Sequence, residues 1–383
     1  MRIPYKELSA LLGRHKSAIP AIPDDRTTVP RADGPVTREA PWSFAAPWDG
    51  RGWVTDLGGP VHWIEFGSGE PAETPPVPAN AAPAGASTAP ANAGTGTMPK
   101  STPADAPPIV FVHGLGGSHL DWVRVGSGFA VDRRAVALDL RGFGLTPGRP
   151  RKARVGANVA LLDRFLREVV GGPAVLVGNS MGGLISLLQT HANPETVAGL
   201  VLVNPALPQP GPRPELRLVA LFLAYTLPGF GEVCVRAEQR LVPAEERVRG
   251  SLGYTFANPF RAPRELVSAM VALTEERRRI PGTAMPFVTA ARSTVPAVVD
   301  RRNRAAMGAI QVPVLLIHGE ADRLVSVLSS QAAAAANPGW ETRFLPDVGH
   351  MPQLEMPEPV LDAVTGWLAR HPALRGRQGV TSA

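Results

Sequence analysis

The sequence contains very little cysteine, since Cys234 is the only one among 383 residues. A single thiol excludes an intramolecular disulfide and any metal cluster built from several cysteines. Aromatic residues, at 6%, and charged residues, at 19%, are also sparse. The hydrophobic content of 44% is nevertheless ample for a buried core and differs from that of a disordered chain. We therefore expect a globular protein whose fold does not depend on the redox state of its surroundings.

The chain also lacks a concentrated block of charge of one sign. Its formal net charge of +6 comes from arginines dispersed along the sequence, whereas a nucleic-acid binder usually gathers them in a stripe or tail. The densest basic run, Arg277 to Arg279, directly follows Glu275 and Glu276, a pattern typical of an exposed helix face. We expect no nucleic-acid partner. Contact with an anionic membrane surface stays open as a minor alternative.

No hydrophobic run is long enough to cross a bilayer, which takes about 20 apolar residues. The most apolar window, Leu216 to Tyr225, is soon interrupted by Pro228, and we expect a helix there that covers or lines a pocket. The stretch from Met1 to Pro20 is charged and has no apolar segment typical of a signal peptide. The expected location is therefore cytoplasmic.

Three stretches are expected to lie outside the core. Residues 1–48 are weakly patterned and then rich in Pro, Asp and Arg, so we expect an N-terminal arm packed on the surface. Residues 69–107 consist mainly of Pro, Ala, Gly, Ser and Thr, which cannot bury enough apolar surface to offset the entropy of ordering. We expect a flexible insertion there, and a flexible tail over residues 374–383.

The rest of the chain predicts an α/β fold. Trp53 to Phe66 is rich in strand-forming residues around Gly58-Gly59, so we expect a hairpin to open the sheet. Short apolar runs then alternate with helical patterns, which predicts a mostly parallel, eight-stranded sheet flanked by helices. The expected parallel strands are 109–112, 135–138, 174–177, 200–203, 314–317 and 342–345, and the expected helices are 155–170, 182–191, 326–336 and 359–370.

One connection is far too long for a crossover between strands. About 100 residues separate Asn204 from Val312, where a crossover needs about a dozen. Their pattern is helical, notably over residues 216–225, 232–241 and 262–278. We therefore expect a helical cap over residues 205–311, inserted into a core formed by residues 49–204 and 312–373.

A strand, a sharp turn and a helix follow one another around Ser180, in the sequence GNSMGG at residues 178–183. A serine at the apex of such a turn has a strained backbone. The residues two before and two after it must therefore lack bulk, as Gly178 and Gly182 do. The turn would project the hydroxyl above the sheet edge, where the next helix points its N–H groups. We predict that Ser180 is a nucleophile, which requires a base because a serine hydroxyl is weak by itself.

Two further loops supply an acid and a base. Asp322 and His350 follow the carboxyl ends of expected strands, the edge at which open α/β sheets build their sites. We predict a catalytic triad in which His350 takes the proton of Ser180 while Asp322 fixes the histidine tautomer. Asp347 and Glu320 stay open as alternative acids. The remaining histidines weighed for this role are assigned to packing or the surface: His62, His191 and His318.

A glycine-rich loop, HGLGG at residues 113–117, follows the first parallel strand. Acyl transfer passes through an oxyanion that needs two rigid donors, and we predict the main-chain N–H groups of Leu115 and Met181 for this role. Gly114 would let the main chain approach the substrate, and His113 is expected to be a structural hydrogen-bonding residue. The spacing fits neither dinucleotide nor phosphate loops. The other histidines and acids show no metal-ligand spacing, so we expect no metal and no organic cofactor.

These segments together resemble the α/β-hydrolase superfamily, from about Trp53 to Arg370 apart from the insertion and the cap. Four features carry the resemblance: residues 113–117, DLRGFG at residues 139–144, residues 178–183, and Asp322 with His350. The resemblance implies that fold, with a 139–144 loop that shapes the floor of the site. A serine at the elbow separates the chain from the haloalkane dehalogenase and epoxide hydrolase branches, which have aspartate there.

The elbow is also similar to that of the meta-cleavage product hydrolases, which cut carbon-carbon bonds. That branch usually has an aromatic residue after the catalytic histidine, whereas Met351 follows His350 here. We expect hydrolysis of a carboxylic ester, or a related acyl bond, of a small apolar substrate through an acyl-enzyme intermediate. Carbon-carbon hydrolysis, acyl transfer, perhydrolysis, membrane-associated lipase activity and non-catalytic ligand binding stay open. Substrate identity and oligomeric state are not predicted.

Overall fold

The computed structural model describes residues 35–40, 43–67, 106–148, 153–208, 226–280 and 284–375. The chain divides into two units, and all of these residues belong to the second, Pro35–Ala383. Several expectations fall outside the described residues. They concern most of the arm, nearly all of the 69–107 insertion, the apolar window Leu216 to Tyr225 and most of the tail.

The described residues form one mixed sheet of nine strands in the order β1-β2-β3-β5-β4-β6-β7-β8-β9. The pairs β1-β2, β2-β3 and β3-β5 are antiparallel. The remaining pairs, from β5-β4 to β8-β9 in the order of the sheet, are parallel. The strands are β1 (Thr37–Glu39), β2 (Gly50–Asp56), β3 (Pro60–Phe66), β4 (Ile109–Val112), β5 (Ala135–Leu138), β6 (Ala174–Asn179), β7 (Val197–Val203), β8 (Val314–Gly319) and β9 (Glu341–Leu345).

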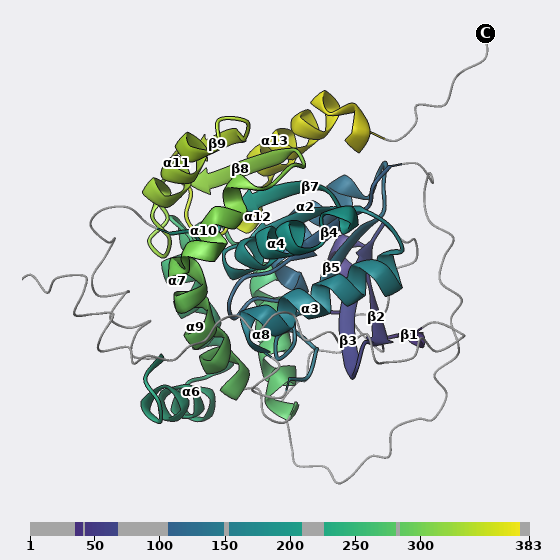
Figure 1. Cartoon of the computed structure of the whole chain (residues 1–383). Coiled ribbons are helices and arrows are strands. Elements are labelled where there is room, and N and C mark those ends of the chain that lie inside the picture. The colour runs from purple at the N-terminus through teal and green to yellow at the C-terminus, as the bar shows by residue number, and fades with distance from the viewer. Residues whose placement is uncertain are drawn as a thin grey trace, which may run out of the picture. The chain divides into compact units, whose positions relative to one another are not determined.

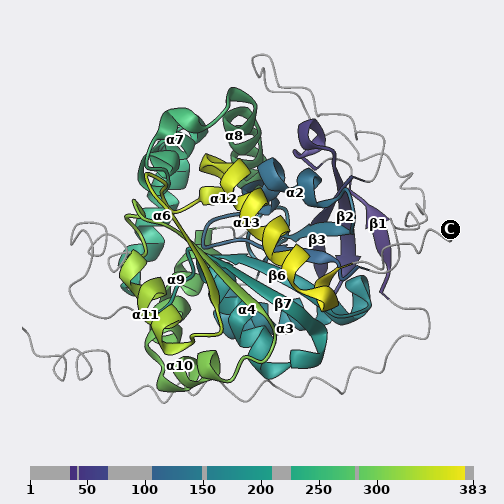
Figure 2. The ribbon, with the colours of Figure 1, turned by 90° about the horizontal axis from the view of Figure 1, so that it is seen from above.

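Helices pack on both faces of the sheet. The helices of the described residues are α2 (Val123–Phe129), α3 (Val155–Phe165), α4 (Met181–Ala192), α6 (Phe230–Leu241), α7 (Ala244–Thr255), α8 (Arg264–Arg279), α9 (Ala284–Val299), α10 (Arg301–Gly308), α11 (Val327–Ala336), α12 (Pro352–Glu355) and α13 (Pro357–Arg370). α3 and α4 lie in front of the sheet in Figure 1, and Figure 2 shows α2 and α13 on the opposite side. The predicted α/β architecture is confirmed.

The alternation of side chains along each strand divides the interior into two cores. In β4, Val110 and Val112 belong to the core that also contains α3 and α4 residues. Ile109 and Phe111 of the same strand belong to the core on the side of α2 and α13. A strand buried on both faces needs apolar residues at every position, which is why the parallel strands appear in the sequence as continuous apolar runs.

Three details of the predicted core are wrong. The sheet has nine strands instead of eight, because Thr37–Glu39 pairs with β2. The proposed N-terminal arm therefore ends too late, and Phe44 and Ala45 are also buried in a core. At the other end, the expected tail begins too early, since Leu374 is buried and its carbonyl accepts a 2.9 Å hydrogen bond from Arg133. A three-residue edge strand has too little periodicity to be read from sequence.

The long connection between β7 and β8 contains α6 to α10, drawn in green in Figure 1, with α6, α7, α9 and α10 on the left and α8 near the centre. α6 and α8 lie within one or two residues of the helices expected at 232–241 and 262–278. α7, α9 and α10 were missed because alanine, glycine and arginine blur their apolar pattern. The limits of the cap stay a prediction, although Ala206 already donates a 3.0 Å hydrogen bond to the Ser180 carbonyl.

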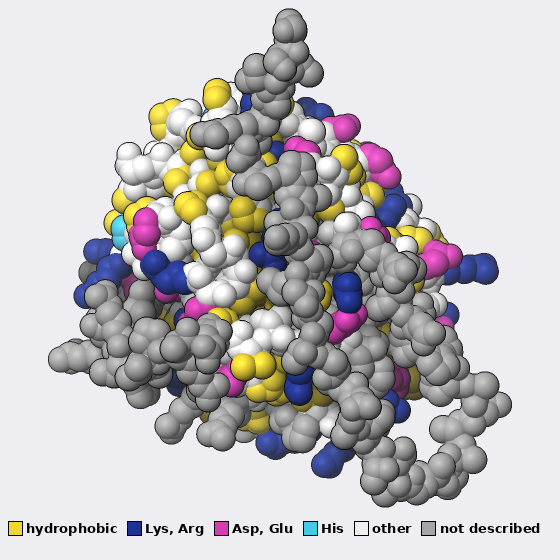
Figure 3. Space-filling view, turned by 90° about the vertical axis from the view of Figure 1, so that its right-hand side faces the viewer, with side chains coloured by type: hydrophobic (Ala, Val, Ile, Leu, Met, Phe, Trp, Pro, Cys, Tyr) yellow, Lys and Arg dark blue, Asp and Glu magenta, His cyan; other side chains and the backbone are white. Residues whose placement is uncertain are grey.

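The surface charges agree with the dispersed pattern of the sequence. On the face shown in Figure 3, arginine and acidic side chains are interspersed among apolar ones. Across the part of the chain that the structure describes, every helix is too short or too polar to pass through a bilayer.

Candidate active site

Ser180 lies at the turn between β6 and α4, with a backbone φ of 54° and ψ of −119°. A serine rarely adopts this conformation, so the surrounding structure must impose it. A Cβ at Gly178 would lie 2.5 Å from the carbonyl oxygen of Gly182, and one at Gly182 would lie 2.1 Å from that of Val112. The geometry thus explains both glycines as sequence analysis expected, and it leaves Ser180 half-buried at the apex of the turn.

Asn179, which sequence analysis did not single out, connects this turn to the predicted base. Its Nδ2 group donates to the carbonyl oxygens of Val203 and His350, both at 3.1 Å. It thereby joins the main chain before the nucleophile to the main chain of the histidine. From sequence alone, an asparagine before the serine indicates no such contact, because its partner, the loop that contains His350, is distant along the chain.

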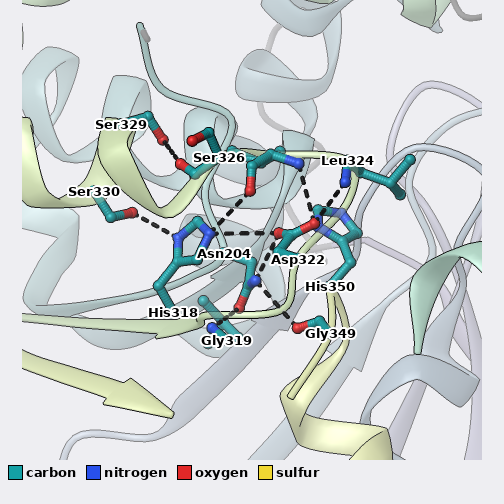
Figure 4. Close-up of polar contacts among 12 residues, drawn as sticks. Asn204, His318, Gly319, Asp322, Leu324, Ser326, Ser329, Ser330, Gly349 and His350 are labelled. Atoms are coloured by element: carbon teal, nitrogen blue, oxygen red, sulfur yellow. Dashed lines mark hydrogen bonds and ion pairs between the residues drawn. The ribbon is translucent and has the colours of Figure 1, made fainter. Parts of the chain in front are cut away.

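Asp322 and His350 meet as predicted, from the loops after β8 and β9. The two side chains are joined by a 2.7 Å hydrogen bond from His350 Nδ1 to Asp322 Oδ2, shown in Figure 4. This contact leaves Nε2 as the ring nitrogen that can take a proton. The alternative acids do not share this position, since Glu320 and Asp347 are both exposed.

The Asp322 carboxylate is buried and fully engaged. Its Oδ1 accepts from the backbone N–H groups of Leu324 at 2.8 Å and Val325 at 3.0 Å. Burial by itself would raise the pKa of Asp322, but the neighbouring His350 and His318 lower that pKa well below its usual range. The group is therefore a fixed anion beside His350, able to stabilise an imidazolium.

Two residues that sequence reasoning missed hold this acid in place. Asn204, at the end of β7, donates from Nδ2 to Asp322 Oδ2 at 2.7 Å and to the Gly349 carbonyl at 3.3 Å. His318, which was assigned to packing or the surface, is buried with its Nε2 3.5 Å from Asp322 Oδ2. Ser330 fixes the other ring nitrogen of His318 at 2.7 Å (Figure 4). Asn204 directly follows the buried strand β7 and His318 lies near the end of the buried strand β8, the one weak signal that could have identified them.

Glu355, also missed, fastens the histidine loop to the cap. This buried carboxylate accepts from the main-chain N–H groups of Gly349 at 2.7 Å, Ala257 at 3.0 Å and Asn258 at 2.9 Å. Arg261 adds a 2.9 Å ion pair from the cap. The cap and the base therefore share one anchor, so the position of His350 depends on the packing of the cap.

The predicted oxyanion loop lies against the nucleophile. A Cβ at Gly114 would lie 3.1 Å from the Cβ of Ser180, so glycine allows the close approach. Met181 is the first residue of α4, and the N–H of a first helical residue has no partner within the helix. Leu115 is partly buried against the core. The assignment of Leu115 and Met181 as oxyanion donors stays a prediction.

His113 has the structural role expected of it. Its Nε2 accepts a 3.0 Å hydrogen bond from the Leu140 N–H, so its Nδ1 carries the proton that it donates to the Gly114 carbonyl at 2.7 Å. Burial lowers the pKa of His113 to about 4. The neutral ring is thus a brace between the 113–117 and 139–144 loops.

Asp139 joins His62 and His119 in a buried cluster. The atoms that could bind a metal ion, a ring nitrogen of each histidine and a carboxylate oxygen, lie within 4.8 Å of one another. The sequence shows no ligand spacing here, because the three positions are brought together only by the fold. Asp139 Oδ2 lies 2.8 Å from His62 Nδ1 and 2.9 Å from His119 Nδ1, and both distances are hydrogen-bond lengths. His119 Nε2 also donates to the Ser43 carbonyl at 2.6 Å. The cluster therefore ties the 139–144 loop to the N-terminal strands.

The cap reaches these loops through α8 and α9. Arg277 of α8 donates a 2.9 Å hydrogen bond to the Gly142 carbonyl. From α9, the Phe287 ring would lie 3.3 Å from a Cβ at Gly116, and Pro286 would lie 2.2 Å from one at Gly142. Apolar side chains of the cap thus lie directly against the loops around Ser180.

Asp121, beside the 113–117 loop, gives a testable pH dependence. Its burial raises its pKa to about 7 although a hydrogen bond from the backbone of Ser118 lowers it. Between pH 4 and 7 the folded state therefore binds more protons than the unfolded state, so stability falls as pH rises. As pH rises over this range, the free energy of unfolding of Asp121→Asn is expected to increase by up to about 4 kcal/mol relative to that of wild type. Denaturant unfolding at several pH values measures this difference.

The control for Asp121 is Asp49→Asn, which changes an exposed carboxylate at a backbone φ of 55° that asparagine tolerates. This variant should keep a constant stability difference from wild type across the same range. A constant difference for Asp121→Asn as well would contradict the assignment of a raised pKa to Asp121.

Comparison with known proteins bears on the family and the fold of the chain. Residues 109–363 match the model of the alpha/beta hydrolase family. The pimeloyl-[acyl-carrier protein] methyl ester esterase of Aromatoleum aromaticum is 26% identical over 266 residues, which cover 66% of this chain and 94% of that protein. The dihydrolipoyllysine-residue acetyltransferase component of the acetoin cleaving system of Pseudomonas putida is 27% identical over 268 residues, or 69% of this chain. That match spans 64% of the relative, less than two thirds of its length.

A solved structure gives the same architecture. The 2-hydroxy-6-oxo-6-phenylhexa-2,4-dienoate hydrolase of Rhodococcus sp. strain RHA1 superposes with a TM-score of 0.56 at 23% identity, over 70% of this chain and 92% of that chain. At this identity the likeness concerns the fold alone. Together with the family match, it confirms the fold class predicted from the sequence.

Proposed function

Because the chain belongs to the alpha/beta hydrolase family, we propose that it is a serine hydrolase that cleaves a carboxylic ester, or a related acyl bond, of a small apolar molecule. The observation that carries the proposal is the buried 2.7 Å pair of His350 and Asp322. Asn179, directly before Ser180, binds the main chain of that histidine. A base, its acid and a serine at a strained turn are the parts that nucleophilic acyl transfer requires.

The proposed reaction runs through two acyl transfers. Ser180 Oγ attacks the substrate carbonyl carbon while His350 Nε2 takes the hydroxyl proton, and Asp322 stabilises the resulting imidazolium. The oxyanion accepts hydrogen bonds from the N–H groups of Leu115 and Met181. His350 then gives the proton to the departing alkoxide, which leaves an acyl-enzyme. Water, deprotonated by His350, releases the acid and restores Ser180. This sequence of steps requires neither a metal nor an organic cofactor.

The surroundings of the site favour an apolar substrate. Phe287 and Pro286 of α9 lie against the glycines of both loops, and Leu207 is buried just after the Ala206 contact with Ser180. Such side chains bind the apolar part of a ligand and exclude water from the reacting carbonyl. The ester specificity of the similar methyl ester esterase is consistent with this proposal.

The test is covalent labelling of wild-type protein with a fluorophosphonate, followed by peptide mapping, alongside hydrolysis of 4-nitrophenyl acetate, butyrate and octanoate. We expect a single phosphonylated site at Ser180 and turnover of at least one ester, with the chain-length trend measuring the space for the acyl group. Labelling without ester turnover would favour carbon-carbon hydrolysis or acyl transfer. A folded protein that neither labels nor turns over would overturn the proposal in favour of ligand binding.

A further inference from the structure

Helix α6 turns an apolar and cationic face outward. Four apolar side chains in and just before this helix are strongly exposed: Leu227 at 55%, Phe230 at 54%, Val233 at 61% and Leu241 at 80%. Arg240 is also exposed, and Arg236 is exposed at the edge of this face, with its guanidinium 3.4 Å from the Met285 Sδ of α9. Residues 230, 233, 237, 240 and 241 share one side of a helix by its 3.6-residue period. The opposite side buries Gly231 and Val235, with α6 packed against α9.

The two acids of α6 are kept off this outward face. Glu232 pairs with Arg292 of α9 at 2.9 Å, and Glu238 lies 3.6 Å from Arg247 of α7. Both pairs lie on the flanks of the helix. The outward face therefore combines large apolar side chains with arginines and has no acid of its own. A face of this kind is unlike the mixed-sign surface of Figure 3.

We propose that the outward face of α6, formed by Leu227, Phe230, Val233, Arg236, Arg240 and Leu241, binds an anionic lipid surface. Helices with this combination lie in the interface of a bilayer, with the apolar side chains among the acyl chains and the arginines at the phosphates. Charge complementarity is the reason to prefer an anionic membrane over another protein. The proposal goes beyond the hydrolase function, because binding can be measured without turnover.

The position of α6 would bring the active site near the membrane. α9 packs on the buried side of α6, and Phe287 of α9 lies against Gly116 in the loop before the nucleophile. Figure 1 shows α6 beside the lower end of α9. A lipid surface bound by α6 would therefore be one helix away from the loops of the site.

The experiment is cosedimentation of the full chain with vesicles of phosphatidylcholine alone and of phosphatidylcholine with phosphatidylglycerol at 7:3. We expect binding to the anionic vesicles, weakened when salt is raised from 50 to 500 mM because the charges are screened. Arg236→Glu with Arg240→Glu should lower the partition coefficient by at least about 25-fold, or about fivefold for each arginine lost. Phe230→Ser with Val233→Ser should lower it by at least about tenfold.

Matched controls place the same changes elsewhere. Arg301→Glu with Arg302→Glu makes the same charge change on α10, and Val131→Ser with Phe260→Ser removes a valine and a phenylalanine that are even more exposed than those of α6. These variants should retain most of the binding. Cys234, the only thiol and a residue of α6, also allows a single environment-sensitive label, whose emission should shift to the blue on anionic vesicles only.

Two results would overturn the proposal. One is wild-type protein that binds neither vesicle at low salt. The other is a loss of binding that is equal in the α6 variants and their controls, which would assign it to net charge alone. If the α6 variants instead change the mass of the protein in solution, the face is an interface with a second copy.

Discussion

Ser180→Ala is expected to lower kcat for 4-nitrophenyl butyrate by about 10⁵- to 10⁶-fold, to a rate supported only by the oxyanion donors and substrate binding. The hydroxyl is the atom that forms the acyl-enzyme in the proposed reaction, so nothing else in the chain can replace it. Steady-state kinetics on purified wild type and variant measure the effect. The backbone conformation of residue 180, with φ at 54°, is imposed by its surroundings and should survive the change.

Ser186→Ala is the matched control for that prediction. Ser186 lies on α4, the helix that follows Ser180, and its buried hydroxyl has no hydrogen-bond partner among the described residues. Its removal should leave kcat within about twofold of wild type and should not destabilise the protein, since an unsatisfied buried hydroxyl contributes little. Equal activity of wild type and Ser180→Ala would remove Ser180 from the mechanism, whatever the labelling pattern.

The second large effect is expected at Asp322, where asparagine should lower kcat by about 10⁴-fold with little change in KM. The carboxylate oxygens accept from His350, Asn204 and the N–H groups of Leu324 and Val325. An amide at this position puts an N–H₂ group against one of those donors. To relieve that conflict, His350 adopts the wrong tautomer, and its charged form loses the fixed anion beside it.

Asp347→Asn separates this role from a general effect of lost charge. Asp347 lies on the same loop as His350 but is exposed, and its φ of 54° is one that asparagine tolerates. We expect kcat within about threefold of wild type. Near-normal kcat in Asp322→Asn, or a large loss in Asp347→Asn, would mean that the wrong acid has been assigned.

The predicted site residues were readable because each has a local signal. Ser180 stands between two glycines whose lack of a Cβ the turn requires, Asp322 follows the buried apolar strand β8, and His350 follows the short strand β9. The residues that hold them were not readable. Asn204 reaches Asp322 across 118 positions of sequence, and the Asn179 side chain reaches the His350 carbonyl across 171. At such separations along the chain, the role of a polar residue can be recognised only when the folded structure shows its partner.

The fold shows the same division. The buried parallel strands and the helices beside them were predicted because apolar periodicity is a property of the local chain. The edge strand Thr37–Glu39 was assigned to the arm, since three residues carry no periodicity and the strand exists only through its pairing with β2. Similarly, α7, α9 and α10 are helical because of the surfaces that they cover more than because of their own pattern.

By itself, then, the sequence determined the α/β architecture, the position of the nucleophile turn and the order of serine, acid and base, because all of these depend on steric and apolar patterns within a few residues. The tertiary structure decided how His350 is anchored to the cap through Glu355, how Asp139 gathers two buried histidines, and which face of α6 remains exposed. Those features depend on groups from distant segments sharing one small volume, where burial and hydrogen-bond geometry determine which partners meet.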